Sequence, residues 1–471
     1  MRRLLNRLRT SRRLYPWLMS WIDRCPAVRA RLRDWAENRA VPQPQEPGQW
    51  PDWHLRFEQQ APLPDDAELR QFWCGGYRAV ISGETISPNW PRRQLLVDVS
   101  DLVRFDLHTG IQRVVRNILL EWLRAPNTCW HVEPVFERQG QYYYARRFAW
   151  QLLGAVPSQS LQAELTDHLV AVKSGDAFVG LDWAMPMLQR AEPLLQHWRR
   201  QGVATCFVVY DLLPMTLPQY YPAQFAQEMS DWLIRLARIG DEVCCISATV
   251  AAELQQFYQR QQQVSPRLSH FYLGSDLAAL EPCPVAGIEL EKGIPVVLMV
   301  GTIDPRKGYW AALDALEALW RNNVQCTLVV VGRVGSRVDA IISRMNRLQQ
   351  QSSAGQRFIW QANCSDSGLE WWYQQADWLL AASEGEGFGL PVLEADRRGV
   401  PVLARDIPVF REVAPPTTEF FTDDDNLAPA IERCLHHQAA AHGKRAIPPH
   451  SPPPAQVSWQ QSAEQLMQKL R

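Results

Sequence analysis

The sequence predicts an α/β protein in which two domains are each built on a buried parallel sheet. Three observations support this prediction. The 471 residues are too many for one ordinary core. Short apolar runs alternate with amphipathic helical stretches, which is typical of strands that helices cover on both faces. The alternation stops in a turn-rich segment at Glu281–Gly293 and then starts again, which divides the chain into two such domains.

The composition is that of a soluble globular protein, with 46% hydrophobic residues, 21% charged residues and a formal net charge of −1. Nothing in this balance indicates a nucleic-acid partner. The ten cysteines form no CxxC pair and most lie in apolar runs, which favours reduced core thiols and a cytoplasmic protein. No apolar run approaches the ~18 residues that cross a bilayer, and none has the form of a signal peptide.

The first 40 residues differ from the rest of the chain because they carry eleven arginines and only three acidic residues. Apolar residues recur there at helical spacing, so we expect residues 1–40 to be a basic amphipathic helical arm. Two interpretations stay open: the arm lies on an anionic membrane surface, or it docks on this protein or a partner. Residues 41–90 are expected to be a proline-rich linker, with six prolines at 41–66.

The first α/β domain is expected over residues 91–285. It opens with the strand-like run "QLLVDVS" (Gln94–Ser100), followed by a loop and the helix-like "TGIQRVVRNILLEWL" (Thr109–Leu123). Further buried strands are predicted at Asp176–Asp182, Thr205–Asp211 and Glu242–Ser247 because each is short, apolar and bounded by polar residues.

The second α/β domain is expected over residues 292–445. Four runs predict its strands: Pro295–Gly301, Cys326–Gly332, Arg357–Ala362 and Asp377–Ser383. Asp423–Asp425 resembles an acidic metal motif, but its place before "NLAPAIERCL" favours a capped helix start. A proline-rich stretch then leads to a last helix, predicted over residues 456–471.

The stretch "EGEGFGLPVLEADRRG" places two glutamates, Glu386 and Glu394, around a glycine-containing turn. Gly387 and Gly389 allow positive φ and close backbone approach, and Pro391 suits the first turn of a helix. We therefore predict an anion site at this helix N-terminus, with Glu386 facing a ligand from the loop and Glu394 in the first helical turn, where it accepts hydrogen bonds from sugar hydroxyls. The alternative makes Glu386 a solvated loop residue and Glu394 a charge favoured by the helix dipole.

A second motif, "VGTIDPRKG" (Val300–Gly308), follows the first strand of the second domain. It places Arg306 and Lys307 beyond the carboxyl end of that strand, where open α/β sheets bind ligands. Two cations at this position suit a diphosphate, although a solvent-facing basic turn is the alternative. Gly332 ends the next strand in the same way, which suits a base or ribose packed on bare backbone.

The sequence resembles the retaining nucleotide-sugar glycosyltransferases of family 4. Four motifs carry this resemblance: "EGFGLPVLEA", "GTIDPRKG", "VVVG" and "DIPVFREV". The resemblance implies the GT-B fold, with two facing Rossmann-like domains and a final helix that crosses back to the first. It assigns Glu386 to the donor sugar, Glu394 to the ribose, and Arg306 and Lys307 to the diphosphate. Other donor-binding positions implied by these motifs are Gly301, Gly332, Gly387, Phe388, Gly389 and Leu390.

The first domain resembles a branch of this family among bacterial surface-polysaccharide enzymes, through "DLHTGIQRVVRN" (Asp106–Asn117) and "VVYDLLPMTLPQYY" (Val208–Tyr221). Thr109 and Gln112 also fit a capping box, and Gly110 would let backbone approach the donor phosphates. The resemblance places Arg113, Tyr210 and Asp211 at the acceptor or the cleft. Arg113 could also contact the donor, and an exposed helix arginine is the alternative for it. The common pattern has His where Tyr210 stands. "ISATV" (Ile246–Val250) and "LGSD" (Leu273–Asp276) match cleft positions too, although capping and turn formation also explain them.

The resemblance implies sugar transfer with retention from a nucleotide diphosphate sugar, which is the co-substrate, to a glycan or lipid-linked acceptor in surface-polysaccharide synthesis. The "TGIQR" branch favours mannose from GDP-mannose. No cofactor or metal is expected, because the two cations would stabilise the leaving group and the histidines show no paired ligand spacing. The enzyme would be cytoplasmic and, if the arm binds lipid, peripheral on the inner membrane face. A non-catalytic scaffold or glycan-binding module and a nucleotide-sugar epimerase are the alternatives.

Overall fold

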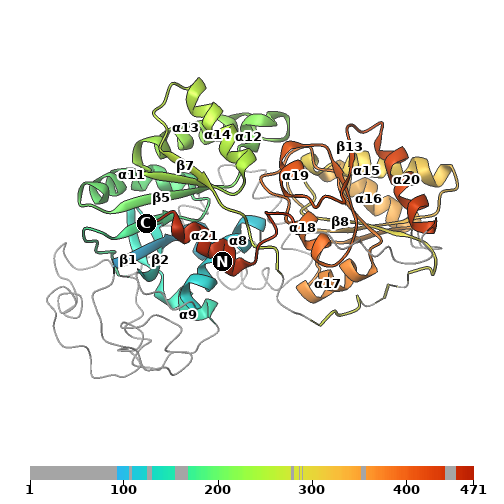
Figure 1. Ribbon diagram of the computed structural model, residues 1–471, viewed down its shortest axis with the longest axis horizontal. Coiled ribbons are helices and arrows are strands. Elements are labelled where there is room, and N and C mark those ends of the chain that lie inside the picture. The colour runs from blue at the N-terminus through green and yellow to red at the C-terminus, as the bar shows by residue number, and fades with distance from the viewer. Residues whose placement is uncertain are drawn as a thin grey trace, which may run out of the picture. The chain divides into compact units, whose positions relative to one another are not determined.

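The computed structural model describes residues 93–104, 109–124, 130–153, 168–276, 281–285, 287–288, 290–351, 357–440 and 452–470 (Figure 1). All of them belong to one compact unit. The predicted arm 1–40 and linker 41–90 lie outside the described residues. The domain boundaries stay a prediction.

The first sheet has seven strands in the order β3-β2-β1-β4-β5-β6-β7. Its strands are β1 (Arg93–Asp98), β2 (Trp130–Arg138), β3 (Gln141–Tyr144), β4 (Ala177–Gly180), β5 (Ala204–Val209), β6 (Glu242–Cys245) and β7 (Arg267–His270). The expectation of a purely parallel sheet is wrong at one edge, where β3 pairs antiparallel with β2. Gln139 and Gly140 both have positive φ between these strands, which makes the two-residue turn of a tight hairpin.

Helices accompany the strands of this sheet, as expected for an α/β protein. They are α7 (Ser100–Arg104), α8 (Gly110–Arg124), α9 (Arg146–Leu152), α11 (Met185–Arg200), α12 (Leu213–Thr216), the 3-10 turn η1 (Pro218–Tyr220), α13 (Ala223–Ile239) and α14 (Ala248–Arg260). The apolar sides of α11, α13 and α14 form one buried cluster with the sheet. Helix α8 packs instead beside the last helix of the chain, α21 (Trp459–Gln468) (Figure 1).

The second sheet has six parallel strands in the order β10-β9-β8-β11-β12-β13. They are β8 (Val296–Val300), β9 (Thr327–Val331), β10 (Phe358–Gln361), β11 (Trp378–Ala381), β12 (Val402–Arg405) and β13 (Glu419–Phe421). Counted along the chain this is the Rossmann order 3-2-1-4-5-6, in which the order reverses between the first and fourth strands. That reversal lies between β8 and β11, so their carboxyl ends mark the expected ligand edge.

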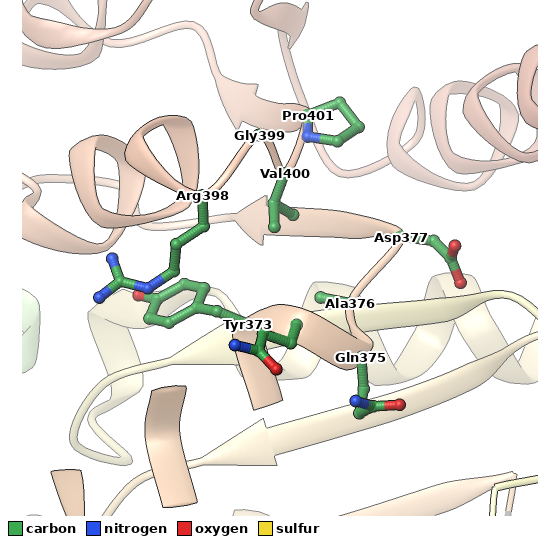
Figure 2. A pocket seen from close by; sticks show the side chains of 9 residues that line it. Tyr373, Gln375, Ala376, Asp377, Arg398, Gly399, Val400 and Pro401 are labelled. Carbon is green, nitrogen blue, oxygen red and sulfur yellow. The ribbon is translucent and has the colours of Figure 1, made fainter. Parts of the chain in front are cut away.

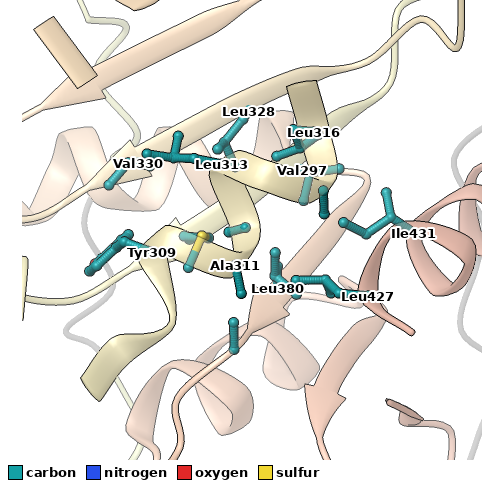
Figure 3. Close-up of a cluster of buried hydrophobic side chains, with 14 of the residues drawn as sticks. Val297, Tyr309, Ala311, Leu313, Leu316, Leu328, Val330, Leu380, Leu427 and Ile431 are labelled. Atoms are coloured by element: carbon teal, nitrogen blue, oxygen red, sulfur yellow. The ribbon is translucent and has the colours of Figure 1, made fainter. Parts of the chain in front are cut away.

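The helices of the second sheet are η2 (Pro305–Lys307), α15 (Tyr309–Arg321), α16 (Asp339–Gln351), α17 (Asp366–Gln375), α18 (Leu390–Arg397), α19 (Pro408–Val413) and α20 (Leu427–Ala440). Figure 3 shows the core that α15 and α20 form with the strands, including Leu316, Leu328, Leu380 and Ile431. Burial of these side chains holds the sheet in place beneath the loops that follow β8 and β11.

The last described helix, α21, packs beside α8 of the first sheet, where the predicted final helix was expected to cross back. Ser458 and Gln461 form a capping box that starts α21. The indole nitrogen of Trp122 on α8 donates to the carbonyl oxygen of Ala463 on α21 at 3.0 Å. Gly274 of "LGSD" pairs with Val457 just before that helix. The "LGSD" segment therefore packs on the chain that leads into α21, a role that neither the cleft nor the turn interpretation predicted.

Candidate active site

Arg306, Lys307 and Glu386 meet at the carboxyl edge of β8 and β11, because these neighbouring strands run parallel and their following loops leave the sheet side by side. Asp304 begins the first loop by accepting a hydrogen bond from the backbone nitrogen of Arg306 at 3.2 Å. Gly308 then takes φ of 72° and starts α15. A Cβ at Gly308 would lie 2.3 Å from the carbonyl oxygen of Ala382, so only glycine lets the two loops approach this closely.

The three charged groups bind one another directly. The Nζ atom of Lys307 donates to Oε1 of Glu386. The Nη1 atom of Arg306 donates to the carbonyl oxygen of Gly385 at 2.8 Å and to Oε2 of Glu386 at 3.3 Å. Ser383 donates from Oγ to Oε1 of Glu386 at 2.7 Å. The charged side chains are only 12–18% exposed, so a solvated loop carboxylate and a solvent-facing basic turn are both wrong descriptions of this site.

The pKa values follow from burial and from this pairing. Burial alone would raise the pKa of Glu386, but Lys307 and Arg306 beside it lower that pKa to about 2. Burial lowers the pKa of Lys307, and the neighbouring Glu386 only partly offsets the change. For Arg306, burial acts to lower the pKa, but Glu386 and other acidic neighbours raise it overall. Glu386 is therefore ionised, and Arg306 is the more firmly charged of the two cations.

The turn into α18 corrects two details of the predicted helix N-terminus. Gly389 has φ of 101°, as expected, whereas Gly387 does not have a positive φ. A Cβ at Gly387 would lie 2.1 Å from the carbonyl oxygen of Tyr210, so this glycine serves close packing against the loop after β5. Leu390 is the first residue of α18, which makes Glu394 its fifth residue, so the placement of Glu394 in the first turn is wrong.

Glu394 is 1% exposed and is held through both carboxylate oxygens. Arg113 on α8 donates from Nη1 to Oε1 at 2.7 Å, and the hydroxyl of Tyr373 on α17 donates to Oε2 at 2.8 Å. Arg398 lies over the ring of Tyr373, with its Cζ atom 4.9 Å from the ring centroid (Figure 2). Arg113 is thus an ion-pair partner of a predicted site residue, and the exposed helix arginine that was the alternative is excluded.

Helix α8 begins as the sequence predicts. The backbone nitrogen of Gln112 donates to Oγ1 of Thr109 at 3.2 Å, and the side chain of Gln112 accepts from the backbone nitrogen of Thr109 at 3.3 Å, which completes the capping box. Gly110 is exposed, and a Cβ there would meet no atom within 4 Å. Asp106, also part of the motif, lies outside the described residues.

Tyr210 follows β5 and turns its side chain into the protein. The side chain is 4% exposed, and its hydroxyl donates to the carbonyl oxygen of Leu181 at 2.7 Å. Its backbone, which packs on Gly387, is therefore the part that reaches the loop after β11. The phenol group of Tyr210 is thus held inside the protein, and the assignment of this residue to the acceptor or the cleft stays a prediction.

Asp211 lies beside the cations. One of its carboxylate oxygens accepts from the backbone nitrogen of Leu213 at 3.0 Å, which starts α12. Burial raises the pKa of Asp211, while the nearby Arg306 acts in the opposite direction. Tyr221 shares this surrounding: burial raises its pKa, the nearby Arg306 acts to lower that pKa, and Asp211 acts to raise it. Asp211 and Tyr221 thus form the side of the site that comes from the first sheet.

Two further glycines and two apolar residues have structural roles at the predicted donor positions. A Cβ at Gly332 would lie 1.7 Å from the carbonyl oxygen of Gly301, so the strand ends pack on each other and not on an open surface. The hydroxyl of Tyr309 donates to that same carbonyl oxygen at 2.8 Å. Phe388 is 3% exposed and supports the turn from within, whereas Leu390 is half-buried at the start of α18.

Ser247 and Glu412 join the two sheets near the site. Ser247 caps α14 by accepting from the backbone nitrogen of Val250 at 3.2 Å, and it donates to the carbonyl oxygen of Gly387 at 2.9 Å. Glu412 on α19 accepts from the backbone nitrogens of Ala248 and Thr249 at 2.6 and 2.8 Å. Both expectations for the "ISATV" segment are therefore met: it caps a helix and it lies where the two sheets meet.

Besides Ser383, which ends the predicted run Asp377–Ser383, four residues of this site were not predicted: Tyr373, Asp304, Tyr221 and Glu412. The Asp-Pro pair at Asp304 is a usable sequence signal, because Asp before Pro commonly starts a helical turn. The other three depend on contacts between distant parts of the chain and have no local signal.

Asp423 accepts from the backbone nitrogen of Asn426 at 3.0 Å just before α20, as the capping interpretation predicts. Among the described residues no cluster of three or more His, Cys, Asp or Glu side chains could hold a metal ion. No helix in the described ranges is long and apolar enough to cross a membrane.

Two cavities lie near these elements. A cavity of about 20 Å³ lies beneath the ion pairs and is lined by Lys307, Ser383 and Glu386 together with apolar residues of β8 and β11. A larger one of about 380 Å³ is lined by Tyr373, Asp377, Arg398 and Pro401 (Figure 2). Because Asp377 and Pro401 precede β11 and β12, this larger cavity lies at the amino edge of the sheet, away from the charged cluster.

Comparison with known proteins bears on the elements that build this site. Residues 286–446 match the family model described as glycosyl transferases group 1. These residues are a group 1 glycosyltransferase domain. The matched range contains β8 to β13, both cations and both glutamates. The group 1 domain thus carries the charged cluster at the reversal of the strand order. From the side of the first sheet, Asp211 lies beside this cluster and Arg113 pairs with Glu394.

Relatives extend the similarity beyond the group 1 domain. The chain is 33% identical over 393 residues to the serotype-specific mannosyltransferase WbdA of Escherichia coli. This similarity covers 80% of this chain and 45% of that protein. It is 24% identical over 283 residues to the lipopolysaccharide core biosynthesis mannosyltransferase LpsB of Rhizobium meliloti, with 56% of this chain and 77% of that protein covered. The chain spans about half the length of the WbdA relatives that it matches.

Solved structures share the fold. Sucrose-phosphate synthase from Thermosynechococcus elongatus superposes with a TM-score of 0.53 at 21% identity, covering 80% of this chain and 98% of that one. Anabaena HepE, solved with UDP and glucose, superposes with a TM-score of 0.50 at 14% identity, covering 80% and 95%. These are GT-B proteins, so the predicted fold class of two parallel-sheet α/β domains is confirmed.

Proposed function

We propose that this protein is a retaining glycosyltransferase that moves a sugar, with mannose favoured, from a nucleotide diphosphate sugar to a glycan or lipid-linked acceptor in surface-polysaccharide synthesis. One observation carries the proposal: Arg306, Lys307 and Glu386 lie together at the carboxyl edge of β8 and β11. That edge is the ligand edge of an open α/β sheet, and the cluster combines two diphosphate-binding cations with a carboxylate that can accept sugar hydroxyls.

The proposed reaction breaks the bond between the anomeric carbon and the diphosphate oxygen and forms a bond from that carbon to the acceptor oxygen on the same face. Arg306 and Lys307 stabilise the negative charge that builds on the departing diphosphate. The acceptor proton passes to the leaving diphosphate. Glu386 orients the donor sugar, and Glu394 binds the ribose. Asp211 and Tyr221 line the acceptor side. In this scheme the cations supply the charge stabilisation, so no metal or cofactor is required.

The choice of donor rests on the relatives. Both WbdA and LpsB are mannosyltransferases by name, and a further relative is the O-antigen chain mannosyltransferase B of Escherichia coli. HepE, in contrast, was solved with UDP and UDP-glucose, and its likeness to this chain concerns the fold. We therefore favour GDP-mannose and keep the other nucleotide sugars in the test.

A donor panel tests the proposal. GDP-, UDP-, dTDP- and ADP-sugars are scored by thermal shift and by nucleotide release in the presence of a glycan acceptor, with Glu386→Ala as the control. We expect one donor to stabilise the wild type and to be turned over much more slowly by Glu386→Ala than by the wild type. A protein that binds no donor would support the non-catalytic scaffold. A protein that alters the donor sugar without transferring it would be an epimerase.

The proposal places the enzyme in the cytoplasm, and residues 1–40 would hold it at the inner membrane face. Support comes from the eleven arginines of that segment, since anionic lipid attracts clustered basic residues. Deletion of residues 1–40 should release the protein from vesicles that contain anionic lipid and leave donor turnover in solution unchanged. Retained vesicle binding after the deletion would rule out the arm as the anchor.

A further inference from the structure

Arg113 and Glu394 come from helices on different sheets and are 281 residues apart in the chain, yet their side chains meet at 2.7 Å. Tyr373 holds the second oxygen of the same carboxylate at 2.8 Å. With both oxygens held and the side chain 1% exposed, Glu394 is fixed in one orientation. Each carboxylate oxygen can accept more than one hydrogen bond, so Glu394 can still accept from a ligand.

The second amino group of Arg113 has a different surrounding. Its Nη2 atom is buried and has no hydrogen-bond partner within the described part of the chain. A buried charged donor without a partner is unfavourable, and proteins rarely leave one in place without a reason. The start of α8 is open on this side, because Gly110, three residues earlier, is exposed and no atom lies within 4 Å of a Cβ built there.

The pair formed by Glu394 and Arg113 suits a hydroxyl group. A hydroxyl donates its proton to a carboxylate and accepts from a guanidinium through its oxygen, so it satisfies both partners at once. A phosphate oxygen would satisfy Nη2 but would be repelled by the neighbouring carboxylate. The chemistry beside Glu394 therefore favours a sugar diol over a phosphate.

We propose that Arg113 is a specificity-determining residue for the nucleotide: its Nη1 atom positions Glu394, and its Nη2 atom donates to a ribose hydroxyl oxygen. This inference rests on the proposed function, because it assigns a further contact to the same donor site. It also makes the ribose a ligand of both sheets, since α8 belongs to the first and α18 to the second. The same arginine then contributes both to nucleotide binding and to the contact between α8 and α18.

The test compares the affinity of the full-length protein for GDP with its affinity for 2′-deoxy-GDP and 3′-deoxy-GDP, measured by calorimetry. The same comparison is made with UDP and its deoxy analogues. We expect the wild type to prefer the ribonucleotide about tenfold or more over at least one analogue, as the loss of one good hydrogen bond implies. Arg113→Met should bind GDP about tenfold more weakly and lose most of that preference.

Two more variants separate binding from folding. Arg113→Lys keeps a cation but cannot donate to Glu394 and to a hydroxyl from two rigid amino groups, so it should fold and also lose the preference. Tyr373→Phe removes a bond to Glu394 but leaves Nη2, so most of the preference should remain.

Three outcomes would overturn the inference. A full ribose preference in both Arg113 variants would exclude the hydroxyl contact. GMP is measured in parallel. If the Arg113 variants lose the wild type's preference for GDP over GMP but keep the ribose preference, Arg113 is assigned to a phosphate. A wild type that binds no nucleoside diphosphate would remove the proposed function together with this inference, whereas nucleotide binding without any role for Arg113 would remove the inference alone.

Discussion

Lys307 and Glu386 are 79 residues apart in the chain and form an ion pair in which each side chain is less than one-fifth exposed. Arg306 joins the same carboxylate at 3.3 Å. A diphosphate that enters this site meets cations whose positions are already fixed by the protein, and little reorganisation is needed when charge develops on the leaving group. The arrangement also means that the two cations have different dependences on Glu386, which leads to separate predictions for each.

Replacement of Arg306 by alanine should lower turnover at least 100-fold, because the removal of one preorganised donor to a developing charge has about that effect. The unfolding free energy of this variant should fall by only about 1–2 kcal/mol, because the bonds to Gly385 and Glu386 are lost. Steady-state kinetics and urea unfolding measure the two quantities. Arg321→Ala, at an exposed arginine on α15, is the matched control and should change neither. Turnover within a few-fold of the wild type would exclude the leaving-group role.

Replacement of Glu386 by glutamine should shift the pH dependence of the remaining activity. Burial lowers the pKa of Lys307, and Glu386 is the neighbour that acts most strongly to raise it. Without that carboxylate the pKa of Lys307 falls further, so Lys307 loses its proton, and its attraction for the diphosphate, at lower pH. The basic limb of the pH–rate profile should therefore move toward neutral pH in Glu386→Gln. An unchanged basic limb would show that Lys307 does not need its charge for the reaction.

Gly387 and Gly110 provide a matched pair of glycine replacements. Gly387→Ala places a methyl group 2.1 Å from the backbone oxygen of Tyr210, and backbone cannot move aside easily, so we expect a loss of about 2 kcal/mol or more in unfolding free energy. Gly110→Ala adds a methyl group in open space and should stay within about 0.5 kcal/mol of the wild type. Equal stability of the two variants, measured by urea unfolding, would contradict the packing of Gly387 on Tyr210.

Much of the fold could be predicted because its buried strands are continuous apolar runs. The strands β2, β3, β7, β12 and β13 were not predicted. The sequence of β2 includes charged residues, and each of the other four strands has at most four residues. Glu133 and Glu137 on β2 are buried, and arginines satisfy them: Arg146 bonds Glu133 at 2.7 Å, and Arg190 bonds Glu137 at 2.7 Å. Buried, paired charges remove the apolar pattern on which strand prediction depends.

The candidate site was predictable to the extent that local motifs determine it. Arg306, Lys307 and Glu386 follow strand ends, and the rule that ligands bind at carboxyl edges brings them together before any coordinates are known. The partners of Glu394 could not be predicted in this way. Tyr373 comes from another helix, and Arg113 comes from the other sheet, so their contact with Glu394 depends on the packing of complete elements.

Glu412 should stabilise α14 although it belongs to the other sheet. Its carboxylate accepts from two backbone nitrogens at the first turn of α14, which would otherwise have no helical partners. Glu412→Ala should therefore lower the unfolding free energy by about 1 kcal/mol, the usual effect of a lost cap. Glu228→Ala, at an exposed glutamate of α13, serves as the control and should change stability by less than about 0.5 kcal/mol. Equal denaturation midpoints for the two variants would exclude a capping role for Glu412.

Asp182 should make the stability of the protein depend on pH between about 4 and 7. Burial raises the pKa of this carboxyl from 3.8 to about 7, although the backbone nitrogens of Leu102 and Trp183 donate to it. In that range the folded protein keeps a proton that the unfolded chain releases, so stability falls as the pH rises. Asp182→Asn cannot titrate and should lose an acceptor for one backbone nitrogen, so it should be less stable than the wild type near pH 4.5. The deficit should shrink or reverse by pH 7.5. Urea unfolding of both proteins at several pH values measures the difference, and a constant difference across this range would show that Asp182 is ionised in the folded state throughout.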